Sequence, residues 1–314
     1  MKIIFFGTPE YVLPVVEKLH KKIKGGLGSP IVGVVTQSPK PTGREKKVTF
    51  SPVDGWAHKR NIPIFYKSSD LLKNNISADV GVLAAYGEII PGAVLKNFKH
   101  GILNIHPSLL PQYRGASPVQ AAIASGLAET GVTIIKLDEK LDHGPILSQF
   151  KEEVLPEDTT DTLRERLFAR GADVLIELLE PYTKGKIKPR EQDHAKASYS
   201  SLVHKSHGFI PPKFLASCLK GKSVRQDWQI PFIKDFSLHP SPASIYNFFR
   251  SLYSWPGAWT YVLVSTPASQ RLKILKAHLE EKKLVIDEVQ LEGKDPVSWS
   301  QFVTGYPNAA FAEE

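Results

Sequence analysis

The chain has 314 residues, of which 42% are hydrophobic, and it carries a formal net charge of +8. At about 100–200 residues per domain, this length predicts two domains with a substantial core. A single cysteine, Cys218, excludes an internal disulfide, and there is neither a secretory signal nor an apolar run of roughly 20 residues, so we expect a cytoplasmic protein without a membrane span.

The first half of the chain alternates apolar runs with amphipathic stretches. Strands rich in β-branched and aromatic residues are expected at 2–6, 31–36, 79–86, 101–106 and 131–137. The segments between them have helical spacing, for example at 10–23, 53–60 and 117–125. This alternation predicts an α/β fold, a Rossmann-like and mostly parallel sheet with helices on both faces. Residues 146–154 alternate in polarity, which favours an edge strand, and a capped helix begins near Thr160.

The chain changes character after residue 183. Residues 184–208 are polar and basic and are interrupted by proline and glycine, as in a linker. Short β-like runs at 259–264, 271–279 and 282–291 predict a smaller β-barrel, OB-like, over residues 209–314. The resulting assignment is a catalytic domain at 1–183, a linker at 184–208 and a C-terminal domain at 209–314.

Positive charge is concentrated in the second half of the chain. Residues 181–314 hold 18 Lys and Arg against 12 Asp and Glu, whereas the first 180 residues are nearly balanced. A basic half joined to a near-neutral half suggests a polyanionic partner such as nucleic acid. A solvated basic surface that only aids solubility is the alternative.

Two glycine-containing turns follow predicted strands. FFGTPE (5–10) could hold an anion at a helix start, but it lacks the G-x-G-x-x-G pattern, so a tight structural turn is an equal alternative. AAYGEIIP (84–91) lies at the carboxyl edge of the expected sheet, where open α/β sheets bind ligands. Its glycine would let the backbone approach a flat heterocycle, although an ordinary connecting loop has the same pattern.

Three polar residues suggest a chemical site. In GILNIHPSLLPQYRGASPVQ (101–120), the period of two places Asn104 and His106 on one face of a strand. Asp142 lies beyond the next predicted strand, and if that strand pairs beside 101–106, both loops leave the same edge of the sheet. A carboxylate beside an imidazole, with a neutral amide donor, suits oxyanion stabilisation and proton transfer at a carbonyl carbon.

No protein nucleophile or metal motif accompanies these residues. The sequence has no G-x-S-x-G, no H-E-x-x-H and no paired cysteines. A substrate should therefore supply the nucleophile, and we expect no metal. Taken alone, an N-x-H pattern would more often be plain structure.

Several segments together resemble a known family. They are FFGTPEYVLPVV, TQSPKPTGREKK, AAYGEIIP, NIHPSLLPQYRGASPVQ and LDEKLDHGPI, with SLYSWPGAWTYV and GKDPVSWSQFVTGYP near the end. They are similar to the 10-formyltetrahydrofolate-dependent formyltransferases, and TQSPKPTGREKKVTFSPV resembles the insertion loop of the methionyl-tRNA formyltransferase family. The resemblance covers residues 1–190 nearly without gaps.

The resemblance implies a reaction and roles for named residues. A formyl group would pass from 10-formyltetrahydrofolate to the α-amine of initiator methionyl-tRNA, for translation initiation, with Asn104, His106 and Asp142 as the catalytic set. Residues that would border the folate are Ser108, Leu109, Leu110, Pro111, Tyr86 and Gly87. The loop at residues 40–47 would contact the tRNA acceptor stem through Arg44, Lys46 and Lys47. The basic linker and the C-terminal barrel, as a tRNA-binding domain, would contact phosphates further out. A polar loop without a partner is the alternative for this segment.

The chain departs from the family pattern in the linker. Leu202 occupies the position where the family usually has the lysine of Tyr-x-x-Lys, and Ile210-Pro211-Pro212 replaces Ile-Asp-Trp, with Trp228 following what resembles an insertion. This departure concerns domain docking and linker contacts to tRNA.

Three rival functions remain at this stage. A formyltransferase acting on an amino-sugar nucleotide would share N-x-H…D without needing the basic loop. A nicotinamide-dependent oxidoreductase would need G-x-G-x-x-G and an acidic residue after the second strand, where Thr36-Gln37 stands. A non-catalytic RNA-binding protein would leave the three polar residues without a purpose. With no exposed apolar stripe evident, we expect a monomer.

Overall fold

The computed structural model describes residues 1–22, 29–42, 47–264 and 269–311. These residues form two compact units. The seven-stranded unit comprises residues 1–115, 129–153 and 164–198, and the five-stranded unit comprises residues 116–128, 154–163 and 199–314. Because each unit draws on three separate stretches of chain, they interleave along the sequence. The predicted boundaries at residues 183 and 209 stay a prediction.

The seven-stranded unit is built on a mixed, mostly parallel sheet with the order β10-β9-β7-β6-β1-β2-β5. Its strands are β1 (Ile3–Gly7), β2 (Ile31–Val35), β5 (Ile64–Phe65), β6 (Val80–Ala84), β7 (Ile102–His106), β9 (Glu129–Lys136) and β10 (Ile146–Glu153). Strand β9 is antiparallel to both β7 and β10, and the other neighbours are parallel. The predicted strands, including β10 at the edge, are confirmed.

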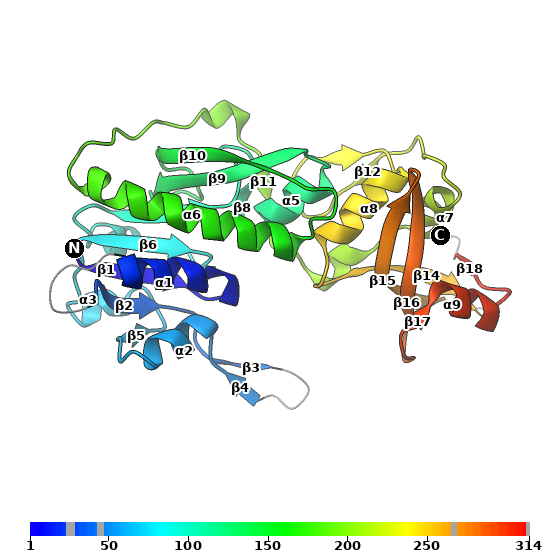
Figure 1. The fold of residues 1–314 in the computed structure, drawn as a ribbon, viewed down its shortest axis with the longest axis horizontal. Helices are drawn as coiled ribbons and strands as arrows, with labels where there is room; N and C mark the ends of the chain where they lie inside the picture. The colour runs from blue at the N-terminus through cyan, green and yellow to red at the C-terminus, as the bar shows by residue number, and fades with distance from the viewer. Residues whose placement is uncertain (23–28, 43–46, 265–268, 312–314) are drawn as a thin grey trace. The chain divides into compact units, whose positions relative to one another are not determined.

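Helices cover both faces of this sheet, as the sequence predicts. On one face, Ile4, Phe6 and Ile102 pack with Leu71 and Val94 from two short helices. On the other face, α6 approaches the sheet so closely that an added Cβ at Gly171 would lie 2.9 Å from Ile105. Figure 1 shows α1 and α6 in front of the strands. Lys18 joins these two helices through Asp173 at 2.7 Å.

The remaining elements of the seven-stranded unit are short, apart from α6. The helices are η1 (Glu10–Val12), α1 (Leu13–Lys22), α2 (Pro52–His58), α3 (Asp70–Lys73), α4 (Gly92–Leu95), α6 (Thr160–Thr183), whose first turn is grouped with the other unit, and η2 (His194–Lys196). The strands are β3 (Lys40–Thr42), β4 (Lys47–Thr49) and β8 (Arg114–Gly115). Helix α2 begins where Ser51 Oγ accepts the Asp54 N–H and Pro52 fixes the first turn.

The five-stranded unit contains an antiparallel sheet with the order β17-β16-β15-β14-β18. Its strands are β14 (Ala258–Leu263), β15 (Gln270–Glu280), β16 (Lys283–Leu291), β17 (Val297–Ser298) and β18 (Ala310–Phe311). The three predicted β runs are thus strands β14, β15 and β16. The outlying pieces are α5 (Pro118–Ala124), β11 (Tyr199–Ser200), η3 (Lys205–Gly208), α7 (Pro212–Leu219), β12 (Trp228–Gln229), β13 (Ser237–Leu238), α8 (Pro242–Ser251) and α9 (Trp299–Gly305).

The chain departs from the family pattern between residues 202 and 228, and part of this segment packs in the core of the five-stranded unit. Ile210 is fully buried, and its N–H donates to the carbonyl of Trp259 in β14 at 2.8 Å. Trp228 is buried against Phe248 of α8, with 4.5 Å between ring centroids. Leu202 remains 60% exposed. Of the residues that depart from the family pattern, Ile210 and Trp228 therefore contribute to packing, whereas Leu202 does not.

A buried arginine fastens α8 to the segment before α6. Arg250 is 6% exposed, and its Nη1 donates to the carbonyls of Leu155 at 2.9 Å and Asp158 at 2.8 Å. Thr160 Oγ1 donates to the Ser251 carbonyl at 2.6 Å. Burial lowers the pKa of the Arg250 guanidinium below its usual value. These partners are mostly backbone groups of loops and helix ends.

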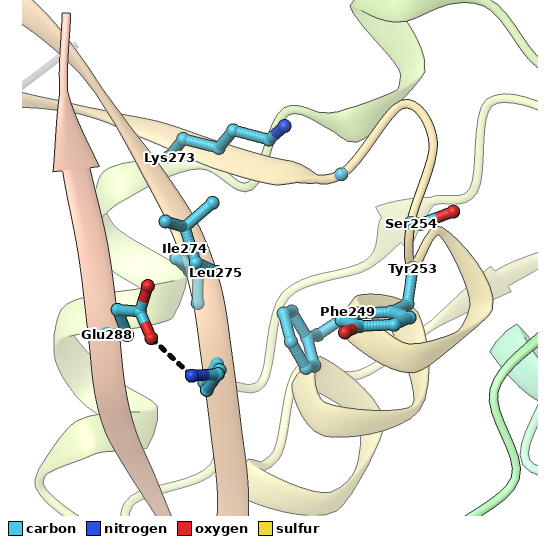
Figure 2. Close-up of a pocket in the computed structure, with 9 residues that line it drawn as sticks. Phe249, Tyr253, Ser254, Lys273, Ile274, Leu275 and Glu288 are labelled. Carbon is cyan, nitrogen blue, oxygen red and sulfur yellow. Dashed lines mark ion pairs between the residues drawn. The ribbon is translucent and has the colours of Figure 1, made fainter. Parts of the chain in front are cut away.

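A cavity of about 270 Å³ opens in the five-stranded unit between the end of α8 and β15. Its lining consists of Phe249, Tyr253, Ser254, Gly257, Lys273, Ile274, Leu275, Lys276 and Glu288. Lys276 pairs with Glu288 at 2.5 Å along one wall (Figure 2). None of Asn104, His106 and Asp142 lines this cavity.

Among the helices in the described part of the chain, none is long and apolar enough to cross a bilayer.

Candidate active site

Strand β7 carries two polar side chains in the middle of the sheet. Asn104 pairs with Ile135 of β9 and Leu83 of β6, and His106 pairs with Thr133 of β9. Alternation along the strand places both on the face of Ile102, opposite Ile105 and α6. The predicted sharing of one face is therefore confirmed, and the helices α3 and α4 lie on that same face.

Asp142 reaches these residues by a different route from the predicted one. Because β9 is antiparallel to β7, its end lies beside Leu103, not beside His106. The expectation that both loops leave one edge of the sheet is wrong. Instead, residues 137–145 leave β9 at Leu137, whose N–H donates to the Ile102 carbonyl, and the chain returns to β10 at Ile146. The loop thus passes over the polar face of β7.

The three side chains meet at one carboxylate oxygen. Asn104 Nδ2 donates to Asp142 Oδ1 at 3.3 Å, and His106 Nδ1 lies 3.6 Å from the same oxygen. The exposed fractions are 5% for Asn104, 4% for His106 and 9% for Asp142. Since Leu141, the residue before Asp142, is 59% exposed, the cluster lies at the margin of the protein surface.

The imidazole ring is oriented by backbone. His106 Nε2 lies 3.0 Å from the carbonyl of Tyr113, and a carbonyl can only accept a hydrogen bond, so Nε2 carries the hydrogen. Nδ1 is then the ring nitrogen that faces Asp142. The Tyr113 carbonyl thus selects which ring nitrogen faces the site.

The second oxygen of Asp142 is held by a backbone amide. Gly115 N–H donates to Asp142 Oδ2 at 2.8 Å. Three non-glycine residues of these loops have left-handed backbone angles, with φ of 54° at Tyr113, 45° at Asp142 and 47° at Ala85. Such conformations cost of order 1–3 kcal/mol each and persist only where the surroundings enforce them. Their clustering marks these loops as a built site.

Two residues absent from the predicted set support the Asp142 loop. Gln192 and Arg114 are 5% and 3% exposed, and Gln192 Oε1 accepts hydrogen bonds from Arg114 Nε at 3.2 Å and Nη2 at 2.7 Å. Gln192 comes from the segment expected to be a linker. A glutamine among charged residues carries no sequence signal of burial, so only the fold reveals it.

The residues expected to border a folate divide by accessibility. Ser108 and Leu110 are buried, with Ser108 Oγ donating to the Gln112 carbonyl at 2.5 Å and Leu110 N–H donating to Thr133 Oγ1 at 3.0 Å. Leu109 and Pro111 are half-buried and thus more accessible. This group remains a predicted binding surface.

Tyr86 and Gly87 behave differently from each other. The Tyr86 ring is fully buried, its hydroxyl donates to Glu88 Oε2 at 3.1 Å, and burial raises its pKa. Gly87 is exposed at φ 85°, a conformation that favours glycine. An added Cβ at Gly92, further along, would lie 2.5 Å from Glu139 Oε1, so this loop abuts the Asp142 loop. The surface near residue 86 is therefore formed by Gly87 and the exposed residues that follow it, not by the Tyr86 ring.

The segment predicted to contact tRNA, residues 40–47, includes β3 and the first residue of β4, which pair as a hairpin. Arg44 and Lys46 lie outside the described residues. Lys47 is exposed at the start of β4, opposite Thr42. The hairpin starts near Gln37, whose Nε2 donates to the Tyr86 carbonyl at 3.3 Å. Figure 1 shows the two strands extending from the end of β2. The hairpin is therefore rooted beside the Tyr86–Gly87 loop.

The FFGTPE turn is tied to the same loop. Thr8 Oγ1 donates to the Tyr86 carbonyl at 3.3 Å and accepts the Gln37 N–H at 3.3 Å. These bonds agree with the structural interpretation of the turn. Within the described ranges, no group of three or more His, Cys, Asp and Glu could hold a metal ion.

Comparison with known proteins gives a consistent result. Residues 1–179 match the family described as "Formyl transferase", and residues 236–285 match "Formyl transferase, C-terminal domain". The methionyl-tRNA formyltransferase of Chloroflexus aurantiacus is 38% identical over 283 residues, which cover 88% of this chain and 80% of that protein.

Solved structures share the fold. A methionyl-tRNA formyltransferase from Clostridium thermocellum aligns with a TM-score of 0.55 and 18% identity, covering 93% of this chain and 98% of that one. An N-formyltransferase from Helicobacter canadensis, in complex with folinic acid and dTDP-3-aminofucose, aligns with a TM-score of 0.61 and 14% identity, covering 95% and 98%. At 18% and 14% identity these structures establish the fold alone. The evidence for methionyl-tRNA over an amino-sugar nucleotide is therefore the 38% sequence identity to a methionyl-tRNA formyltransferase.

Proposed function

Since the chain belongs to the formyltransferase family, as a methionyl-tRNA formyltransferase, we propose that Asn104, His106 and Asp142 carry out its formyl transfer. The observation that supports this assignment is the meeting of an amide, an imidazole and a carboxylate at Asp142 Oδ1, within 3.3 and 3.6 Å. Asn104 and His106 are held on strand β7 and Asp142 on a loop with left-handed backbone at that residue, which fixes their relative positions.

The α-amine of the esterified methionine is the nucleophile. Esterification removes the neighbouring carboxylate and thereby lowers the pKa of the amine, so a neutral fraction exists near pH 7. The amine nitrogen bonds to the formyl carbon, and the bond from that carbon to the donor nitrogen breaks. The proton released by the amine passes to the Asp142 carboxylate and then to the departing nitrogen.

Asn104 and His106 stabilise the formyl oxygen as it gains negative charge. The Asn104 amide has two hydrogens, one of which is directed at Asp142, and the second is available to the substrate. His106 presents Nδ1, because Nε2 is engaged by Tyr113, and it donates to the formyl oxygen from Nδ1 when the ring carries a hydrogen on both nitrogens. Loss of one such preorganised donor typically lowers kcat about 10²–10³-fold.

The family uses formyl-tetrahydrofolate donors, and we propose 10-formyltetrahydrofolate for this chain. The exposed backbone at Gly87 and the large exposed side chains of Ile89 and Leu141 fit a flat, partly apolar heterocycle. These residues lie on two abutting loops, one of which carries Asp142. Leu109 and Pro111 would border the donor, and it would supply the one-carbon group.

Methionyl-tRNA is the second substrate, and we propose that Arg44, Lys46 and Lys47 contact its acceptor stem. Support comes from the rooting of the hairpin at Gln37 beside Tyr86 and from the exposure of Lys47. Initiator specificity, a monomeric state and a cytoplasmic location stay predictions.

The test is a product assay with matched variants. The protein is incubated with 10-formyltetrahydrofolate and either methionyl-tRNA or an amino-sugar nucleotide, and Asp142→Asn and His106→Ala are compared with the unmodified chain. We expect formylmethionyl-tRNA only, and about 10²–10⁴-fold lower kcat in each variant with little change in KM. Near-normal kcat in both variants would refute the catalytic assignment, and formylation of the sugar nucleotide alone would refute the proposed substrate.

A further inference from the structure

Gln192 uses its whole carboxamide on groups that surround the candidate site. Its Nε2 donates to the carbonyls of Asp142 at 2.9 Å and Gly144 at 2.8 Å, while its Oε1 accepts from the Arg114 guanidinium. At 5% exposure, water cannot replace these partners. One side chain thus joins the Asp142 loop to the residue preceding Gly115.

The Asp142 loop needs external support because its backbone is strained. Asp142 has φ of 45°, a left-handed conformation that a non-glycine residue keeps only where the surrounding structure enforces it. Gln192 holds the carbonyl of this residue and the carbonyl two positions later. Gly144 is confined as well, since an added Cβ would overlap the Lys136 carbonyl oxygen. The loop is therefore fixed on both sides of His143.

The partners of the carboxylate and the imidazole are attached to the same return segment, residues 190–198. Arg114 precedes Gly115, whose N–H holds Asp142 Oδ2. Ser198 Oγ accepts the Tyr113 N–H at 2.9 Å, and the Ser198 carbonyl accepts the Arg114 N–H at 2.9 Å. Tyr113 in turn orients His106. The return segment therefore supports both sides of the catalytic set.

We propose that Gln192 is a positioning residue for formyl transfer, which fixes the Asp142 carboxylate relative to His106 and Asn104 by bridging Asp142, Gly144 and Arg114. The inference rests on the proposed function. The bridge requires one terminal group whose nitrogen donates two hydrogen bonds and whose oxygen accepts two. Among side chains, only a carboxamide has this combination. A misplacement of about 1 Å at a reacting group can lower the rate about 10²-fold.

The informative variant is Gln192→Glu. The carboxylate keeps the acceptor for Arg114 but loses both donors and faces two carbonyl oxygens. We expect kcat to fall about 100-fold, with the KM for each substrate within about threefold of the unmodified value. Gln192→Asn keeps both kinds of group on a shorter side chain and should recover part of the lost kcat.

The matched control is Asn97→Asp. Asn97 Nδ2 donates to the Ile76 carbonyl at 2.8 Å in the same unit, so the substitution removes an equivalent bond away from the catalytic set. We expect kcat within twofold of the unmodified value for this control. Equal losses in Gln192→Glu and Asn97→Asp would overturn the proposal, as would a kcat within threefold of normal in a folded Gln192→Glu protein.

A double-mutant cycle separates positioning from a general structural effect. If Gln192 acts through Asp142, then Gln192→Glu should cost less than about threefold in kcat when Asp142 is already asparagine. A full 100-fold further loss would overturn the proposal. The proposed function is tested independently, because it fails if Asp142→Asn retains activity, whatever Gln192→Glu does.

Discussion

Each unit contains a buried arginine, and the two arginines have different hydrogen-bond partners. Arg250, in the five-stranded unit, donates to two backbone carbonyls and to Asn247 Oδ1 at 3.1 Å. Arg114, in the seven-stranded unit, donates to the side chains of Gln192 and His194. Burial is nearly the same, at 6% and 3%. The partners, and what those partners hold in place, distinguish a structural arginine from one that supports a site.

The largest effect is expected from Arg114→Met. The substitution removes the guanidinium that donates to Gln192 Oε1. Gln192, which holds the Asp142 loop, then loses its anchor at residue 114. We expect kcat to fall about 100-fold, measured under saturating substrates well below the melting temperature. The companion variant is Arg250→Met, which should leave kcat within twofold. If both variants lose kcat equally, the distinction between the two arginines fails.

Arg250→Met should instead act on stability. Two buried carbonyls lose their donor, and each unsatisfied group costs about 1–3 kcal/mol, so we expect a loss of about 3 kcal/mol in the free energy of unfolding. Urea denaturation of the full chain measures this. The exposed Arg225 gives a control in the same unit, because Arg225→Met should change stability by less than about 0.5 kcal/mol. If Arg250→Met left the free energy of unfolding unchanged, the hydrogen bonds of Arg250 to Leu155 and Asp158 would not be needed for stability.

A smaller effect is expected from the hairpin. Arg44→Ala should raise the KM for methionyl-tRNA several-fold and reduce the dependence of log affinity on log salt by about one charge contact. Lys99→Ala, an exposed lysine just before β7, is the control and should leave both unchanged. If Arg44→Ala slows formylation of a small amine equally, the loop does not recognise tRNA.

The smallest effect concerns the only thiol. Burial raises the pKa of Cys218 to about 11, so the thiolate is scarce at pH 8, and a thiol reagent should label the native protein at least about 100-fold more slowly than the urea-unfolded chain. Because the native pKa lies above the unfolded value, the stability from the protonated thiol is complete below pH 9 and is lost as the pH rises through about 11. Cys218→Ala should lack this alkaline component. Equal labelling rates would contradict the burial argument.

Strands were predictable from the sequence where apolar runs are continuous. β1, β2, β6 and β7 differ from their predicted ranges by a few residues at most. The direction of β9 was not predictable, because a strand buried on both faces has the same pattern whether it runs parallel or antiparallel. Asn104, His106 and Asp142 were first grouped by the strand period and by an expected shared edge, and the edge argument is wrong. The resemblance over many motifs implies the same set and does not depend on strand direction.

Other parts of the structure left weaker signals. The start of helix α8 has a recognisable sequence signal, a serine at 241 followed by Pro242 and, three positions on, Ser244. In the structure Ser241 Oγ accepts the Ser244 N–H at 3.1 Å. Gln192 has none, because a polar residue in a basic stretch is indistinguishable from a solvated one until the fold encloses it. The gap is physical, since burial of a polar side chain is decided by residues distant in the sequence.

The interleaving of the two units limits how this gene could be rearranged. A cut after residue 183 would discard Gln192 and Ser198, on which the Asp142 loop and Tyr113 depend, and would strand α5 away from α8, against which it packs. Because each unit comprises three stretches of chain, recombination at a single point in the gene cannot exchange one complete unit without the other. We therefore expect recombination to exchange the two units together, so that they are inherited as one block.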